Sequence, residues 1–314
     1  MTMYSPDISV VIPISERHDD IRKLYNIYAR ELTNLGKSFE FIFIIDGNFP
    51  VAFNELVKLK NEGNPIRIGK FAKKFGESLA LMEGFRLSKG EMILTLSSYI
   101  QIEPKDLEKV ILATEEGNDL VVTRRYPRKD PMVNRIQSYL YHLMVRKLTG
   151  TPFKDITSGM RMFKKNALSE FVLYGDLHRF IPIFAVQKGM KVKEVKVTQR
   201  KEDTRSRVVN LGVYIRRILD ILTLFFLVKF TKKPLRFFGL IGTSLFLPGL
   251  FFTAYLILLR LVGSVSLSNR PLFLLGILMM VFGIQTFSLG LIGELIIYCH
   301  SKELESYKID EIIE

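Results

Sequence analysis

Four short segments carry the polar side chains that could do chemistry, and each follows a stretch of apolar residues. They are residues 13–16, 46–48, 70–76 and 97–101. The third segment contains Lys70, Lys73 and Lys74, and cations aimed at a reacting group stabilise the negative charge that develops on it. The fourth offers only hydroxyl and amide oxygens, which are weak ligands for Mg²⁺ or Mn²⁺. We therefore expect no metal site built from the fourth segment alone.

Alternating strands and helices are expected to position these segments. Apolar runs predict strands at Ile8–Ile14, Phe39–Ile45, Pro65–Ile68 and Glu91–Leu96, and helical spacing predicts helices at Asp19–Leu35, Val51–Lys60 and Gly76–Leu87. This alternation favours an α/β fold with a mainly parallel sheet. Ligands of such sheets bind beyond the carboxyl ends of the strands, where all four segments lie.

The composition excludes several classes of protein. The chain has 314 residues, a net charge of +13 and 48% hydrophobic residues, too apolar for a disordered chain. Its one cysteine, Cys299, can form neither an internal disulfide nor a cysteine metal cluster. The basic residues lack interleaved aromatic residues, so we expect no nucleic acid partner.

Two charge-free runs near the carboxyl end, Phe237–Leu259 and Leu272–Gly293, are long enough to cross a membrane. A spanning helix needs about 20 apolar residues; the alternative is a pair of buried core helices. Residues 211–230 have apolar and charged sides and predict an interfacial helix, with a short core helix as the alternative. Glycines in the two runs permit close helix contacts and therefore homo-oligomerisation.

The basic residues that flank these runs predict an orientation. Lys229, Lys232, Lys233 and Arg236 precede the first run, whereas the loop between the runs has only Arg260 and Arg270. The positive-inside rule then places both termini in the cytoplasm, and no signal peptide is evident. The expected parts are a domain at 1–207, a juxtamembrane helix at 208–234, two transmembrane helices at 235–298 (about 237–259 and 272–294) and a tail at 299–314.

The same segments resemble the family-2 glycosyltransferases that act on polyprenyl phosphates, of the dolichyl-phosphate mannose synthase and bactoprenol glucosyltransferase type. The resemblance is carried along nearly the whole chain by VVIPISE (10–16), FIFIIDGN (41–48), KKFGESLALMEGF (73–85), DITSGMRMF (155–163), HRFIP (178–182), KPLRFFGLIG (233–242) and GLIGE (290–294). It implies a Rossmann-like nucleotide-diphospho-sugar transferase domain, an interfacial helix and two membrane helices. It also implies a nucleotide-sugar donor and a polyprenyl phosphate acceptor.

The resemblance assigns expected roles to residues of this chain. For donor binding they are Pro13, Glu16, Asp46, Lys74, Ser97, Ser98 and Arg124, with Gln101 near the diphosphate. For the acceptor phosphate they are Arg135, Ser158 and Arg161; Arg135, Arg161 and Gln101 are the catalytic candidates. His178 and Arg179 are either part of a buried helix start or substrate contacts, and Asp155 either caps a turn or orients the acceptor.

The chain departs from the resembled pattern where a metal would bind. The family's Asp-x-Asp-x-Gln stretch reads Ser97-Ser98-Tyr99-Ile100-Gln101, and Ile45 replaces the first residue of its Asp-Asp pair. The resemblance implies Mg²⁺ or Mn²⁺ as a cofactor, but both aspartate ligands of that ion are absent.

Two accounts follow from these departures. In the first, Lys73, Lys74, Arg124 and Arg125 stabilise the leaving group in place of the metal, and an inverting transfer to polyprenyl phosphate serves synthesis of cell-envelope glycan or glycolipid. In the second, the chain has lost catalysis and acts as a membrane-bound partner or regulatory subunit, because fold alone does not fix function. A transporter would need broken or charged helices, which two plain spans do not supply.

Overall fold

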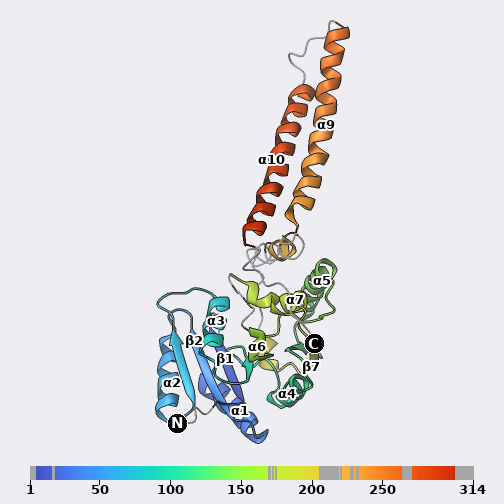
Figure 1. Ribbon diagram of the computed structural model, residues 1–314. Helices are drawn as coiled ribbons and strands as arrows, with labels where there is room; N and C mark the ends of the chain where they lie inside the picture. The colour runs from blue at the N-terminus through green and yellow to red at the C-terminus, as the bar shows by residue number, and fades with distance from the viewer. Residues whose placement is uncertain are drawn as a thin grey trace, which may run out of the picture. The chain divides into compact units, whose positions relative to one another are not determined.

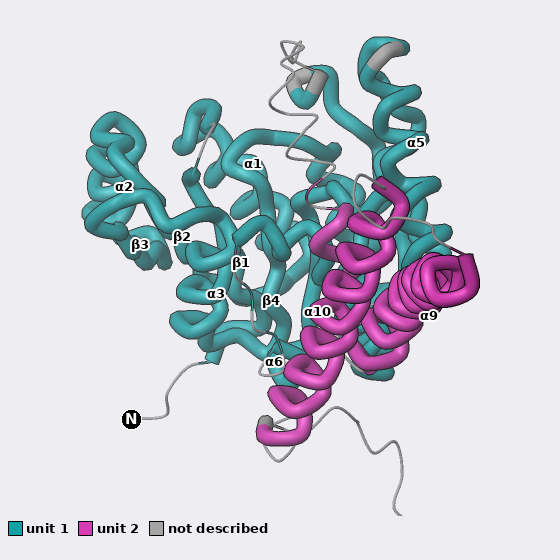
Figure 2. Tube along the Cα trace, turned by 90° about the horizontal axis from the view of Figure 1, so that it is seen from above, with its two compact units in different colours: residues 1–214, 307–314 teal, residues 215–306 magenta. Residues whose placement is uncertain are grey.

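The structure is a computed structural model (Figure 1) that describes residues 5–15, 18–168, 171, 173, 175–204, 219, 221–226, 230, 233–263 and 271–300. The chain divides into two compact units, and the boundary falls between residues 214 and 215 (Figure 2). The described residues up to 204 form an α/β domain. Those from 219 onward include two long apolar helices, so the expected fold class is confirmed.

One sheet of seven strands organises the first unit, in the order β3-β2-β1-β4-β6-β5-β7. The strands are β1 (Ile8–Ile14), β2 (Phe39–Ile45), β3 (Ile66–Lys70), β4 (Met92–Thr95), β5 (Leu120–Arg125), β6 (Arg161–Lys164) and β7 (Val192–Val197). Strand β6 runs antiparallel to its neighbours β4 and β5, whereas the other pairs are parallel. The sheet is therefore mainly parallel, as predicted.

Helices connect the strands and cover both faces of the sheet. They are α1 (Ile21–Asn34), α2 (Pro50–Asn61), α3 (Glu77–Leu87), α4 (Leu107–Glu115), α5 (Met132–Thr149), α6 (Lys165–Leu168) and α7 (Ile181–Gln187), with short 3₁₀ turns η1 (Pro104–Asp106), η2 (Leu177–Phe180) and η3 (Lys201–Thr204). Helix α1 begins where Asp20 accepts a hydrogen bond of 2.9 Å from the Lys23 N–H, which satisfies one free donor of the first turn. The three predicted helices agree with α1, α2 and α3 to within two residues at each end.

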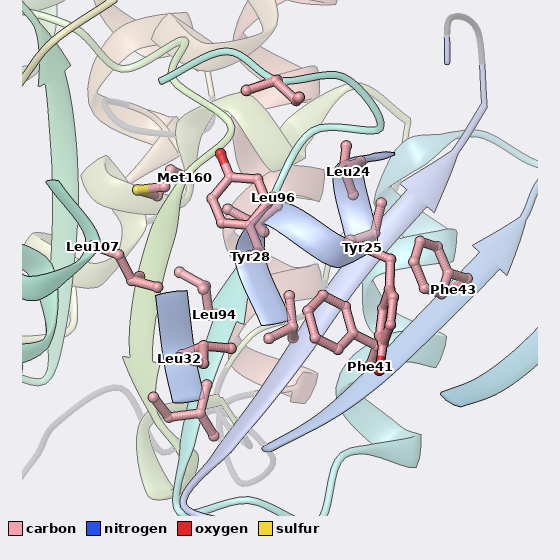
Figure 3. Close-up of a cluster of buried hydrophobic side chains, with 14 of the residues drawn as sticks. Leu24, Tyr25, Tyr28, Leu32, Phe41, Phe43, Leu94, Leu96, Leu107 and Met160 are labelled. Atoms are coloured by element: carbon pink, nitrogen blue, oxygen red, sulfur yellow. The ribbon is translucent and has the colours of Figure 1, made fainter. Parts of the chain in front are cut away.

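The main core lies between the sheet and helices α1, α2 and α4. Figure 3 shows this cluster, in which Leu32 of α1 lies beside Leu94 of the sheet. All seven residues of β1 are buried, because helices pack on both of its faces. Opposite the main core, α3 lies so near β1 that a Cβ at Gly84 would be 2.2 Å from a methyl of Val11.

The second unit contains α9 (Pro234–Val262) and α10 (Pro271–His300). Both have the length and composition of membrane spans, with a mean hydropathy of 2.1 in their most apolar windows. The predicted spans at 237–259 and 272–294 fall inside them. Residues 208–234 lie mostly outside the described part of the chain, as do residues 301–314. The interfacial helix, the tail and the domain boundaries thus stay predictions.

Glycines spaced seven residues apart bring α9 and α10 into backbone contact. Gly242 and Gly249 of α9 face Gly283 and Gly276 of α10, and a Cβ at either α9 glycine would lie 2.7 Å from the carbonyl oxygen of its partner. A seven-residue repeat keeps one stripe of each helix on the partner, and small residues let the backbones approach. The contact leaves no room for a side chain.

We predict that Gly283→Leu destabilises this helix pair. The new side chain must displace the backbone of α9, since a Cβ at Gly283 would lie 2.8 Å from the Gly242 carbonyl oxygen; overpacking of this kind costs about 1–3 kcal/mol. Thermal unfolding of the detergent-purified chain, followed by circular dichroism, should show a lower Tm. The matched control is Ile284→Leu, at an outward position that is 55% exposed. Equal Tm values for the two variants would contradict the close contact.

Candidate active site

A cavity of about 650 Å³ opens at the carboxyl ends of β1, β2 and β3. Its walls come from three of the four polar segments that the sequence singles out. The lining residues are Ser15, Asp46, Gly47, Asn48, Phe49, Lys70, Phe71, Ala72, Lys73 and Lys74. Of the expected donor residues, Asp46 and Lys74 line this cavity. Pro13 is buried within β1, and Glu16 lies outside the described residues.

Asp46 connects two walls of the cavity. Its carboxylate is fully buried and accepts hydrogen bonds from the Phe75 N–H at 2.5 Å and the Gly76 N–H at 2.9 Å. Charge-assisted bonds to backbone N–H groups are among the stronger hydrogen bonds in proteins. Asp46 therefore fixes the segment 71–76 relative to the end of β2, in addition to bordering the cavity.

The lysines make one wall of the cavity cationic. Lys70 Nζ lies 4.9 Å from the centre of the Phe53 ring, and Lys73 Nζ lies 5.4 Å from that of Phe75. Aromatic contacts hold an ammonium group without neutralising it. Because Asp46 already uses both carboxylate oxygens, this wall suits a negatively charged ligand such as a phosphate group.

The segment after β4 does not line the cavity. Ser98 and Gln101 are buried, and the Gln101 side chain accepts a 2.9 Å bond from the Gly159 N–H and donates a 3.4 Å bond to Asp203. A Cβ at Gly159 would lie 2.1 Å from Ser97 Oγ, so Gly159 packs directly on Ser97. The segment is thereby joined to residues 158–159, as a support for the sheet edge.

No other group of side chains among the described residues replaces the two missing aspartates of the Asp-x-Asp-x-Gln stretch. Within the described ranges, no group of three or more His, Cys, Asp or Glu side chains is arranged to hold a metal ion. Asp203 is the carboxylate that contacts Gln101, and it is bonded to Arg125 and Gln199. The donor set at the end of β4 therefore does not fit a divalent cation.

A buried ion cluster lies beneath this edge. The Arg125 guanidinium is 2.8 Å from Asp155 and 3.1 Å from Asp203, and Arg128 is 2.9 Å from Asp155. Burial alone would raise the pKa of Asp155, but the nearby charges of Arg125 and Arg128 outweigh burial and hold it well below its usual value. Arg125 therefore shares its charge with two carboxylates, while Arg124, the next residue, points away from them toward the Tyr126 ring.

The expected acceptor residues separate into a buried pair and an exposed member. Ser158 is 1% exposed and lies 2.5 Å from the Thr123 hydroxyl. Arg161 is 5% exposed and donates to the carbonyl groups of Ile156 and His178; burial lowers its pKa to about 10. Arg135 is exposed on α5. The structure thus brings Ser158 and Arg161 into one buried segment, with Arg135 on a separate surface.

Two features of the site escape prediction from sequence. Asp203 has no motif around it, and its role follows only from its contacts with Arg125 and Gln101. His178 is buried beside the Ser78 hydroxyl, 3.1 Å away, and burial with the charges of Arg179 and Arg161 lowers its pKa to about 3. His178 lies in η2, and its Nε2 is also 3.5 Å from a Glu77 carboxylate oxygen; the HRFIP motif alone does not reveal these contacts.

Helix α5 has an exposed apolar face that is difficult to recognise in its partly polar sequence. Five of its large side chains are 49–76% exposed: Met132, Ile136, Tyr139, Leu140 and Met144. Four of them recur every fourth residue and so share one side of the helix. We refer to these five residues as the α5 face; Arg135 precedes Ile136 at its border.

We predict that Asp155→Asn strongly destabilises the first unit. Removing one partner of a buried ion pair leaves Arg125 and Arg128 undercompensated, a loss of about 3–5 kcal/mol. The pKa of Asp155 is lower in the folded state than in the unfolded state. The stabilisation that its carboxylate provides is therefore fully present above the unfolded-state pKa of about 4, and it is lost as the pH falls through the lower folded-state pKa. Thermal unfolding at pH 7 therefore measures it fully.

The control for Asp155→Asn is Lys37→Ala. This variant removes an ion pair with Glu115 that is partly open to solvent, and exposed pairs contribute about 0–1 kcal/mol. If both variants lower the Tm equally, the buried cluster is not a main source of stability.

Comparison with known proteins agrees with this architecture. Residues 9–172 match glycosyl transferase family 2. A mannosyl-3-phosphoglycerate synthase from Rubrobacter xylanophilus superposes with a TM-score of 0.54 at 12% identity, over 69% of this chain and 73% of that one. A glucosyl-3-phosphoglycerate synthase from Mycobacterium tuberculosis, in complex with Mn²⁺, UDP-glucose and glycerol 3-phosphate, gives 0.52 at 17% identity, over 70% and 80%. These structures share the GT-A-like fold.

Two relatives match almost the whole chain. The dodecaprenyl-phosphate galacturonate synthase of Rhizobium johnstonii is 24% identical over 93% of this chain and 88% of its own length. The undecaprenyl-phosphate 4-deoxy-4-formamido-L-arabinose transferase of Proteus mirabilis is 26% identical over 98% and 94%. The family match covers more than half of the chain, and these matches extend through both units. The chain therefore belongs to glycosyltransferase family 2 and is a distant relative of the polyprenyl-phosphate sugar transferases.

Proposed function

We propose that this protein transfers a sugar from a nucleotide-sugar donor to a polyprenyl phosphate, with inversion at the anomeric carbon, for synthesis of a cell-envelope glycan or glycolipid. A phosphate oxygen of the acceptor attacks the anomeric carbon. The bond from that carbon to the nucleoside diphosphate breaks, and the diphosphate leaves with the electron pair. A phosphate monoester has a second pKa of about 6 and is mostly ionised at neutral pH, so the nucleophile needs no protein base.

The cavity beyond β1, β2 and β3 is the donor site in this proposal. Its volume of about 650 Å³ is adequate for a large part of a nucleotide sugar. Lys70, Lys73 and Lys74 supply positive charge for the diphosphate, which becomes more negative as it leaves. Arg125 contributes little to this charge, because Asp155 and Asp203 compensate it.

The α5 face is the observation that carries the choice of a lipid acceptor. A soluble acceptor would not require five large apolar side chains open to solvent on one helix. A polyprenyl phosphate has an apolar chain and an anionic head, and the α5 face with the exposed guanidinium of Arg135 beside it matches both. Arginine is suited to bidentate contacts with phosphate.

Membrane anchoring completes the proposal. Helices α9 and α10 have the length and hydropathy of spans, and the basic residues before α9 favour a cytoplasmic position for both termini. An enzyme held at the cytoplasmic side of the inner membrane meets nucleotide sugars from one side and its lipid acceptor from the other.

We predict that donor binding does not require a metal. Thermal unfolding of the detergent-purified chain should be measured with a panel of nucleotide sugars, with Mn²⁺ and with a chelator. A ligand that binds only the folded state raises the Tm, and one donor should do so in the chelator. Transfer to undecaprenyl phosphate should then fall more with Lys74→Ala than with removal of Mg²⁺.

Lys89→Ala is the matched control for Lys74→Ala, since Lys89 does not line the cavity. A strict requirement for added metal would exclude replacement of the ion by basic side chains. If no donor shifts the Tm at millimolar concentration, the chain is better described as a partner or regulatory subunit that has lost catalysis.

We also predict that Ile136→Asp impairs use of long lipid acceptors. A charge on the α5 face disfavours contact with a polyprenyl chain, so KM for undecaprenyl phosphate should rise by roughly tenfold, about 1.4 kcal/mol. KM for a short, water-soluble prenyl phosphate should change little. Leu112→Asp, at a 53% exposed position on α4, is the control. Equal effects of Ile136→Asp on both acceptors would argue against a lipid-binding role of α5.

A further inference from the structure

Two cations meet at one exposed aromatic ring where β5 and β7 end. Arg124 of β5 and Lys196 of β7 are direct partners in the parallel register. The Arg124 guanidinium carbon lies 5.3 Å from the centre of the Tyr126 ring, and Lys196 Nζ lies 5.8 Å from it. The Tyr126 side chain is itself 56% exposed.

The positive charges of Arg124 and Lys196 are not compensated by carboxylates of the described residues, unlike those of their neighbours on the same strands. Among the described residues, neither Arg124 nor Lys196 has a carboxylate at ion-pair distance, whereas Arg125 has two. Lys193, three residues earlier on β7, contacts Glu116. Like charges directly opposite each other on adjacent strands are destabilising, so an anion placed between Arg124 and Lys196 would relieve their repulsion.

The acidic group nearest along the same side of β7 does not supply that anion. Glu194 lies two residues before Lys196, about 7 Å away along the strand. Its Oε1 accepts hydrogen bonds from the backbone N–H groups of Lys154 at 2.7 Å and Asp155 at 3.1 Å. The Glu194 carboxylate therefore binds the backbone of the segment that begins at Lys154.

We propose that Arg124, Tyr126 and Lys196 form a binding site for a phosphate group, separate from the nucleotide-sugar cavity. The guanidinium offers a bidentate fork, the ammonium a compact charge and the phenol a hydrogen-bond donor. None of the three residues lines the cavity. Strand β5 is three strands away from β1, which is about 14 Å. The site does not depend on the proposed sugar transfer.

The absence of tryptophan from the chain gives this site a clean reporter. Tyr126→Trp introduces a single indole near the two cations and keeps an aromatic face there. Its emission should be titrated in the full chain with sodium phosphate in a neutral detergent. In a second arm, the same variant is placed in nanodiscs of phosphatidylcholine with or without phosphatidylglycerol, without added phosphate.

The two arms distinguish the sources of the phosphate group. A saturable change with inorganic phosphate, absent with sodium chloride at equal ionic strength, identifies a site for free phosphate. A change that needs phosphatidylglycerol identifies a site for a lipid headgroup. Either response should weaken at least tenfold in apparent affinity when Arg124→Gln and Lys196→Gln are added, and should persist with Lys193→Gln, which neutralises a lysine on the opposite side of the same strand.

The unmodified chain provides a second measurement that does not rely on the reporter. Under the conditions of the arm that responds, the ³¹P resonance of phosphate or phosphatidylglycerol should broaden with the wild type and less with the Arg124→Gln, Lys196→Gln double variant. The proposal is overturned if neither arm gives a response, if chloride acts as well as phosphate, or if the double variant responds like the wild type.

Discussion

The buried contact between Arg125 and two carboxylates organises the carboxyl edge of the sheet. Asp155 precedes β6 and Asp203 lies in η3, so a single guanidinium joins β5 to two segments that are distant in sequence. Asp203 also contacts Gln101, which in turn holds Gly159. Gly159 packs on Ser97, so these contacts link the end of β5 to the segment that follows β4. A low-dielectric interior strengthens such a network and makes each member difficult to replace.

Local patterns were sufficient to predict the first half of the sheet. Strands β1 and β2 are continuous apolar runs, and each is followed by a helix with regular apolar spacing. The predicted bounds of both strands are the observed ones, and those of both helices agree to within two residues. Strands β5, β6 and β7 were not predicted. For β6 the reason is that RMFK is short and has no clear period. Its antiparallel direction depends on pairing with β4 and β5, which no local pattern encodes.

The candidate site likewise contains residues that local sequence could predict and residues that it could not. Asp46 and Lys74 follow strands whose ends could be predicted, and both border the cavity. Ser158 and Arg161 belong to a recognisable motif, but their burial comes from contacts with Thr123 and with backbone carbonyls. The role of Arg125 depends on Asp203, which follows it by 78 positions. Burial and charge compensation are properties of the packed domain, so residue type alone could not reveal them.

The antiparallel direction of β6 has a consequence for how this domain can diversify. Strand β5 ends at Arg125 and β6 begins at Arg161, and because the strands run in opposite directions both positions lie at the same edge of the sheet. Residues 126–160, which include α5, therefore form one connection that begins and ends at the same edge of the sheet. Insertions or substitutions within this connection need not alter the strand order or the cavity beyond β1–β3. In the proposed function, changes within residues 126–160 alter the contacts with the acceptor while the nucleotide-sugar cavity keeps its lining residues.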